Sequence, residues 1–134
     1  MEDILIDTYV VIEYLRSRDK SSTELIELLQ EHYLFISAIS EFELYLGART
    51  AKHEKDLDSI FNEVEIIAYD SGCGKIAADI WKALQLTHQN VEIKDIFIAS
   101  IAIRNDVWLR TFNEKHFKGI EKLKMWKGDK VRKH

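Results

Sequence analysis

The chain has 134 residues, of which 46% are hydrophobic and 31% are charged, and its formal net charge is −4. This composition is typical of one soluble globular domain over residues 1–134, and no linker, repeat or low-complexity segment divides it. A membrane span of ~20 apolar residues and a disulfide framework are both excluded, because no apolar run is that long and Cys73 is the only cysteine. The acidic start Met-Glu-Asp is not a secretory signal, so we expect a cytoplasmic protein with no membrane partner.

Short apolar segments alternate with longer amphipathic ones. In chain order we expect a strand at residues 3–6, a helix at 9–15, a helix opening at Ser21, a strand at 33–36 and a helix opening at Ser40. There follow a helix through residues 57–61, a strand at 64–69, a long helix through 76–86, an apolar helix at 96–103, a strand at 107–111 and a fifth strand at 123–126. This alternation predicts an α/β fold with a mostly parallel sheet.

Four polar side chains stand where apolar segments begin or end. Asp7 and Asn113 follow predicted strands, whereas Glu43 and Asp95 lie in the first turns of predicted helices. In a parallel α/β sheet these positions meet at the carboxyl edge of the strands. Three carboxylates brought together repel one another, and a divalent cation relieves that repulsion. The pattern therefore predicts a metal-dependent site.

Each of the four side chains also has a purely structural explanation. Asp7 could cap the helix that follows it, and Asp95 could cap the apolar helix. Ser40 and Glu43 match a capping box, in which each side chain satisfies the other's backbone donor. Asn113 could form the turn that stops its strand. Taken singly, capping explains Asp7 and Glu43 at least as well as metal binding does, so the metal interpretation depends on convergence.

Other nearby residues bear on the choice. Gly47 lies one turn after Glu43 and would clear space beside the carboxylate, since a glycine inside a helix costs up to ~1 kcal/mol relative to alanine. Thr111 could donate its hydroxyl to a carboxylate or a phosphate. His116 is interpreted as structural rather than catalytic, because no serine or cysteine nucleophile pattern accompanies it.

Positive charge is concentrated at the C-terminus. Residues 115–134 contain 8 Lys or Arg residues and 2 acidic residues, although the chain as a whole is acidic. This segment, whose last residues from about 127 to 134 could form a flexible basic tail, would attract phosphates or would simply keep the protein soluble. The sequence leaves both interpretations open.

With these positions placed in order, the chain resembles the PIN domain family, and in particular the VapC-like toxins of type II toxin–antitoxin modules. The resemblance covers nearly the whole chain. It is carried by Ile4-Leu-Ile-Asp7-Thr8, by Ser37-Ala-Ile-Ser-Glu-Phe-Glu43-Leu-Tyr-Leu-Gly47-Ala48, by Asp95-Ile-Phe-Ile-Ala99-Ser100 and by Leu109-Arg-Thr111-Phe-Asn113-Glu-Lys-His116-Phe117.

The resemblance implies a three-layer α/β/α domain with a central parallel five-stranded sheet in the order 3-2-1-4-5. It implies a metal-dependent endoribonuclease that hydrolyses RNA phosphodiester bonds, with one or two Mg²⁺ ions, or Mn²⁺ as a substitute. On this model the metal ligands are Asp7, Glu43 and Asp95, Asn113 positions a water, and Thr8 and Thr111 support the cluster. The implied partners are an RNA substrate, an antitoxin protein that covers the cleft, and a second copy in a homodimer.

The chain departs from the family pattern at three places. Tyr9 stands where Asn or Ser is common, Asn113 occupies the fourth acidic position, and residues 88–94 lack a glycine commonly found before the third acid. Asn113 weakens the argument for a second tightly bound metal. The alternative hypothesis is a non-catalytic PIN-like α/β module that binds RNA or a protein partner.

Overall fold

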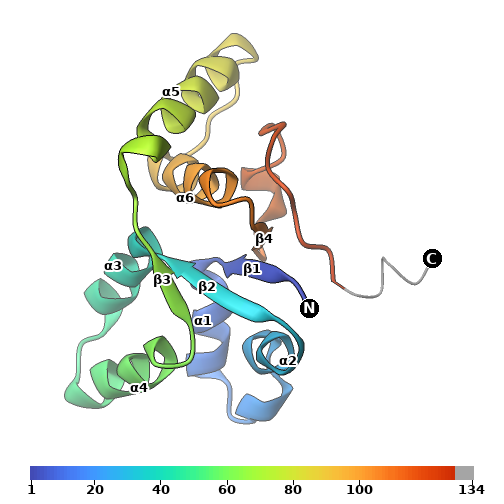
Figure 1. The fold of residues 1–134 in the computed structure, drawn as a ribbon. Helices are drawn as coiled ribbons and strands as arrows, with labels where there is room; N and C mark the ends of the chain where they lie inside the picture. The colour runs from blue at the N-terminus through green and yellow to red at the C-terminus, as the bar shows by residue number, and fades with distance from the viewer. Residues whose placement is uncertain (129–134) are drawn as a thin grey trace.

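The computed structural model describes residues 1–128, and its centre is a sheet of four parallel strands (Figure 1). The strands are β1 (Asp3–Ile6), β2 (Tyr33–Ser37), β3 (Glu65–Ile67) and β4 (Trp108–Arg110). They lie in the order β3-β2-β1-β4, with Ile4 of β1 paired to Leu34 of β2 on one side and to Trp108 of β4 on the other. The predicted α/β class with a parallel sheet is therefore confirmed.

The prediction of a fifth strand at residues 123–126 is wrong, because this segment does not form a strand of the sheet. The segment at residues 123–126 does lie beside β4 and runs parallel to it, but it contributes only one bridge, between Met125 and Leu109. Two backbone hydrogen bonds hold it there: Leu109 N donates to Lys124 O at 2.8 Å, and Trp126 N donates to Leu109 O at 2.7 Å. The chain turns through residues 117–122, so it becomes extended too late to form a longer ladder.

Helices cover both faces of the sheet (Figure 1). In residues 1–128 the α-helices are α1 (Thr8–Arg16), α2 (Glu24–Glu31), α3 (Ala38–Gly47), α4 (Ala51–Phe61), α5 (Ser71–Leu86) and α6 (Ile93–Arg104). One hydrophobic cluster joins the sheet to α1, α2, α3 and α4, and a second joins it to α5 and α6. None of the helices in this described part has the length and apolar character needed to cross a membrane.

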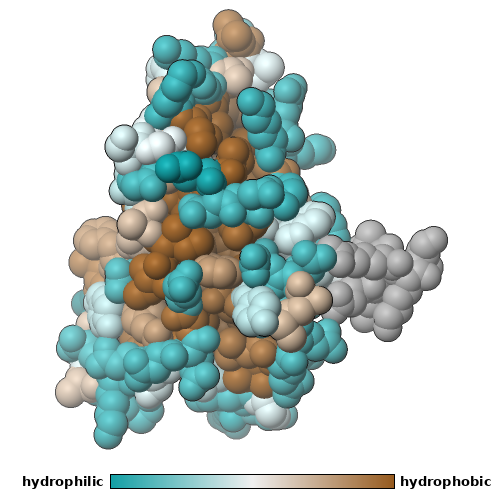
Figure 2. Space-filling model, in the orientation of Figure 1, coloured by the Kyte–Doolittle hydropathy of each residue, from teal (hydrophilic) through white to brown (hydrophobic). Residues whose placement is uncertain are grey.

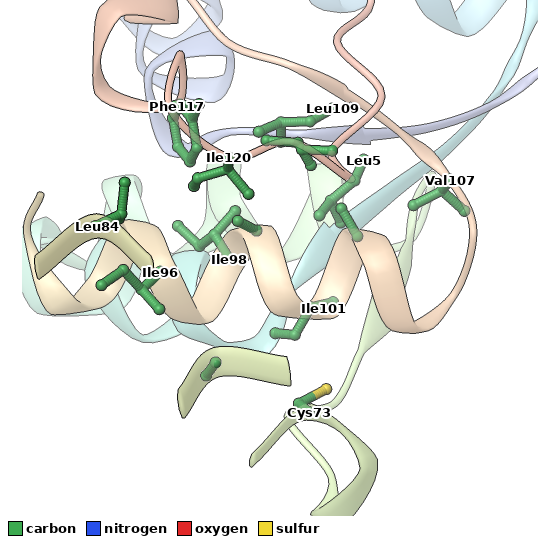
Figure 3. Packing of buried hydrophobic residues seen from close by; sticks show 14 residues of the cluster. Leu5, Cys73, Leu84, Ile96, Ile98, Ile101, Val107, Leu109, Phe117 and Ile120 are labelled. Atoms are coloured by element: carbon green, nitrogen blue, oxygen red, sulfur yellow. The ribbon is translucent and has the colours of Figure 1, made fainter. Parts of the chain in front are cut away.

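Three consecutive residues of strand β1, Ile4, Leu5 and Ile6, are apolar, with no polar residue alternating between them. Successive side chains of a strand point to opposite faces, and here both faces are covered by helices. Ile4 and Ile6 belong to the cluster with α1 and α2, whereas Leu5 belongs to the cluster with α5 and α6. Figure 3 shows Leu5 in that second cluster together with Ile98 and Ile101 of α6.

The start of α3 differs from the prediction. The helix begins at Ala38 rather than at Ser40, because Ser37 is its N-cap and accepts a hydrogen bond from Ser40 N at 3.0 Å. Ser40 therefore lies in the first turn, fully buried, and the proposed capping box between Ser40 and Glu43 does not form. The Glu43 side chain is thus free of a capping role.

The packing of the core predicts how truncation of a buried side chain changes the free energy of unfolding. Truncating the fully buried Ile98 to alanine leaves a cavity between α6 and the sheet, so Ile98→Ala should lower the free energy of unfolding by about 2–5 kcal/mol in urea denaturation. The matched control is Leu86→Ala, because the Leu86 side chain at the end of α5 is 83% exposed and should change stability by less than about 0.5 kcal/mol. Equal effects of the two substitutions would contradict the packing described here.

Candidate active site

Asp7 is fixed between β1 and β4. Its backbone N–H donates to Arg110 O at 2.9 Å, which continues the pairing of the two strands by one residue. Its Oδ1 accepts a hydrogen bond from Thr8 N as the N-cap of α1, and its Oδ2 accepts one from Thr111 Oγ1, both at 2.8 Å. The Asp7 side chain therefore caps α1 and also lies among the residues of the predicted site.

Asp95 enters the same region from the first turn of α6. Its backbone N–H donates to Glu92 O, and its Oδ2 lies 3.1 Å from His116 Nδ1. Asp7 and Asp95 are each only 5% exposed. Burial raises the pKa of both carboxyls, and the neighbouring negative charge of Asp7 raises the pKa of Asp95 further. Two buried acids therefore lie within electrostatic reach of each other.

Asn113 completes this group from the segment after β4. Its backbone N–H donates to Thr111 Oγ1 at 3.0 Å, so Thr111 connects Asn113 to Asp7. Asp7, Asp95 and Asn113 all line one cleft of about 70 Å³. The convergence predicted from strand and helix ends is found for these three side chains.

Glu43 is connected to this cleft but does not line it. Its Oε1 accepts a hydrogen bond from Thr8 Oγ1, and its Oε2 accepts one from Lys94 Nζ, both at 2.8 Å. The Glu43 side chain lines a neighbouring groove of about 350 Å³ together with Gly47. A Cβ at Gly47 would have no atom within 4 Å, so this glycine borders open space, as its sequence position suggested.

Three residues at the site were missed by sequence reasoning: Glu92 and Lys94, which line the cleft, and Ser40. Lys94 forms an ion pair with Glu43, and its own pKa is raised chiefly by this hydrogen bond. The Ser40 hydroxyl lies within hydrogen-bond distance of the Thr8 hydroxyl, 2.8 Å between Oγ and Oγ1, and this contact is buried. The only signal for Lys94 was its place directly before Asp95, and its partner lies 51 residues away. His116, interpreted as structural, does contact an acid of the site.

The cleft offers the donor chemistry of a hard cation, although not a complete cage. Within residues 1–128, no three acidic, histidine or cysteine side chains are grouped closely enough to hold a metal ion. Mg²⁺, however, is usually bound by one or two carboxylates, with waters and substrate phosphates as the other ligands. Asp7 and Asp95 provide two buried carboxylates at one cleft, and the described hydrogen bond of the Asp95 side chain uses Oδ2 alone. These two residues fit such an ion.

A family model and curated relatives of this chain point to the same protein family. Residues 4–123 match the model of the PIN domain. The chain is 32% identical to Ribonuclease VapC1 of Methanocaldococcus jannaschii and 28% identical to Ribonuclease VapC10 of Mycobacterium tuberculosis, in each case over 121 residues. These alignments cover 90% of this chain, and 82% and 90% of the two relatives respectively.

Solved structures agree on the fold. The chain is similar to a chain in the structure of VapBC2 from Rickettsia felis bound to a promoter DNA fragment, with a TM-score of 0.82 and 23% identity over 92% of this chain and 97% of that one. It is similar to a chain of DNA-bound VapBC from Salmonella typhimurium, with a TM-score of 0.81 and 21% identity over 94% and 98% of the two chains. At these identities the likeness concerns the fold alone.

Relieving the buried charge should stabilise the protein in the absence of metal ions. The pKa of Asp95 is raised above its ordinary value of 3.8, so the carboxyl costs folding stability as the pH rises through its folded-state pKa. Asp95→Asn should therefore increase the free energy of unfolding by on the order of 1 kcal/mol at neutral pH in the presence of a chelator. The gain should disappear below about pH 3.8, where both states of the wild-type carboxyl are protonated.

The control for this measurement is Asp79→Asn. Asp79 is exposed, and its hydrogen bond from Lys75 lowers the pKa of its carboxyl, so its replacement should give no gain at neutral pH. A loss of stability in Asp95→Asn at neutral pH would show that the contact with His116 outweighs the burial of charge.

Proposed function

The chain belongs to the PIN domain family, and from this premise we propose that it is a metal-dependent endoribonuclease that acts as the toxin of a type II toxin–antitoxin pair. The observation that carries the proposal is the pair of buried carboxylates, Asp7 and Asp95, which reach one cleft from different ends of the chain. Support comes from the two relatives described above, both of which are named ribonucleases.

We assign the following roles to the residues of the cleft. Asp7 and Asp95 would hold a Mg²⁺ or Mn²⁺ ion, and Thr111 would keep Asp7 in the geometry for doing so through its hydrogen bond. Asn113 would orient a water or a phosphate oxygen in the cleft. A bound divalent cation supplies water activation and charge neutralisation at the scissile phosphate. Thr8 would position Glu43 through its hydroxyl group.

Binding of RNA to an acidic chain requires a local source of positive charge. The exposed Lys115 and Lys118 lie on the segment that follows Asn113, one residue before and two residues after the cleft residue His116. They would attract the phosphate backbone once a cation offsets the acids of the cleft. Farther along the same basic segment, Lys124 pairs with Asp106 and Lys127 with Glu114, so their charges are partly compensated. The last part of the predicted tail, residues 129–134, lies outside the described residues.

An antitoxin would have a groove to occupy. The groove of about 350 Å³ lies between α1, α3 and α4, and its lining combines the apolar Ile12, Leu44 and Leu57 with the cationic Arg16 and Lys52. An apolar and acidic segment of a partner protein fits this lining. Because Glu43 also lines the groove, such a segment would contact Glu43, which the Thr8 hydroxyl connects to the neighbouring cleft of Asp7 and Asp95.

A homodimer is the second partner proposal. Figure 2 shows apolar side chains gathered in a band down the middle of the face on which β3 lies. Large apolar side chains exposed on β3, on the segment after it and on the flanking helices include Ile66, Tyr69, Phe42, Leu46 and Trp81. Contiguous apolar surface of this kind typically marks a protein interface.

One observation favours the alternative of a non-catalytic module that binds RNA or a protein. Glu43 already has a cationic partner in Lys94, so part of the acidic charge is compensated without any metal. A metal titration separates the two functions. If Mn²⁺ at 100 times its Kd binds only the folded state, it should raise the free energy of unfolding by about 2.7 kcal/mol. No stabilisation by millimolar Mn²⁺ would favour the non-catalytic module.

Cleavage of RNA tests the enzyme directly. The wild-type protein should cut members of a panel of tRNA, rRNA fragments and messenger RNA in the presence of Mg²⁺, and a chelator should stop the reaction. Asp7→Asn and Asp95→Asn should each reduce the rate at least ~100-fold, because even outer partners of metal ligands cost about 10- to 100-fold. Product sizes and rates on denaturing gels give the measurement.

The matched control for cleavage is Asp79→Asn, which removes the same charge from an exposed position on α5 and should leave the rate unchanged. Folded wild-type protein that shows no metal-stimulated cleavage on the whole panel would refute the enzymatic proposal.

Thr111→Val tests the support of Asp7. Valine has nearly the volume of threonine but removes the donor to Asp7 Oδ2 and the acceptor for Asn113 N. We expect Mn²⁺ affinity and cleavage to fall together by about 10- to 100-fold, the usual effect of losing an outer-shell partner. Thr111→Ser keeps the hydroxyl and should restore most of the affinity. Unchanged Mn²⁺ affinity in a folded Thr111→Val protein would remove Thr111 from the site.

A further inference from the structure

Lys94 places a fixed positive charge inside the acidic group. Its Nζ lies 2.8 Å from Glu43 Oε2 and 3.8 Å from Glu92 Oε2. It precedes Asp95 in α6, and its charge also acts on the Asp7 carboxyl. The ammonium group is thus surrounded by the acids that a metal ion would otherwise neutralise.

Both carboxylate oxygens of Glu43 accept hydrogen bonds. Thr8 donates its hydroxyl to Oε1 and Lys94 donates its ammonium to Oε2. A divalent cation bound to Oε2 would have to displace the Lys94 ammonium or lie next to it and be repelled. Asp7 and Asp95 carry no such cationic lysine hydrogen bond among the described contacts, and they share the cleft.

The pair differs from the other lysine–carboxylate pairs on helices. Lys52–Asp56 and Lys75–Asp79 are neighbours one turn apart on a single helix. Lys94–Glu43 instead links α6 to α3, and the side chains of Glu43 and Lys94 are 21% and 40% exposed. A partly buried pair between two helices has a defined position and is screened less by solvent than a surface pair.

We propose that Lys94 is the built-in second cation of the site: its ammonium group neutralises Glu43, so that one divalent ion binds, at Asp7 and Asp95. This inference rests on the proposed metal-dependent function and specifies how many ions that function uses. It also changes the role of Glu43, which was placed among the ligands by resemblance. Glu43 becomes the residue that holds Lys94 over the cleft, and Lys94 supplies the charge that a second ion would supply.

The test is the number of Mn²⁺ ions bound per chain, measured by isothermal titration and by the paramagnetic signal of free Mn²⁺. The wild-type protein should bind one ion. Lys94→Met keeps the length of the side chain but removes its charge, and it should bind a second ion at the freed Glu43. That second ion should disappear in the double variant Lys94→Met with Glu43→Gln, whereas the first should remain.

Two controls separate charge from general disturbance of the fold. Lys94→Arg retains the positive charge and should bind one ion. Lys75→Met removes an exposed lysine with a 2.9 Å contact to Asp79 on α5, a helix that contributes no residue to the lining of the cleft, and should also bind one ion. Circular dichroism and thermal unfolding of each variant establish that it is folded.

Two ions in the wild-type protein, or one ion of unchanged affinity in folded Lys94→Met, would overturn the assignment of Lys94. If Mn²⁺ binding is still abolished by Asp7→Asn and RNA is still cleaved, the proposed function survives that result. Absence of any Asp7-dependent Mn²⁺ binding would overturn both proposals together.

Discussion

The burial of Asp7 and Asp95 at the carboxyl edge of the sheet is the constraint on which the rest of the site depends. A carboxylate loses hydration when it is buried, and a second carboxylate nearby increases the cost. The surrounding residues reduce that cost locally: Thr8 N and Thr111 Oγ1 donate to Asp7, and His116 contacts Asp95. These contacts hold the acids in place without removing the excess negative charge, which is the condition that a cation-binding site requires.

The elements around these acids are closely packed, and this explains how side chains distant in the chain are brought to one place. Asp7 follows the central strand β1, whose apolar residues are fully buried between two layers of helices. Thr111 follows β4, which pairs directly with β1. Asp95 projects from α6, a helix buried along much of its length against the same sheet. Each acid therefore inherits its position from a packed element rather than from a loop.

Much of the fold could be predicted from sequence because apolar runs identify buried strands. Residues 3–6 were placed without error, since an uninterrupted apolar run bounded by a charged residue leaves little ambiguity. The strand predicted at 123–126 was wrong because strand formation depends on pairing with a neighbouring strand, and in this segment only Met125 forms a bridge, to Leu109. At the site, strand and helix ends indicated Asp7, Asp95 and Asn113. Lys94 could not be found in this way, because its ion pair with Glu43 is a tertiary contact that has no local pattern.

The two edges of the sheet are unequal. The β4 edge is shielded by the segment that carries Met125, whereas among the described residues β3 pairs with β2 alone. An unpaired edge invites strand addition by another chain, but β3 is only three residues long and begins with the exposed Glu65. A short, charged edge is a poor template for extending the sheet. Two copies that met on this face would therefore join through the apolar side chains around β3, and each copy would keep its sheet, and with it the spacing of its acids, unchanged.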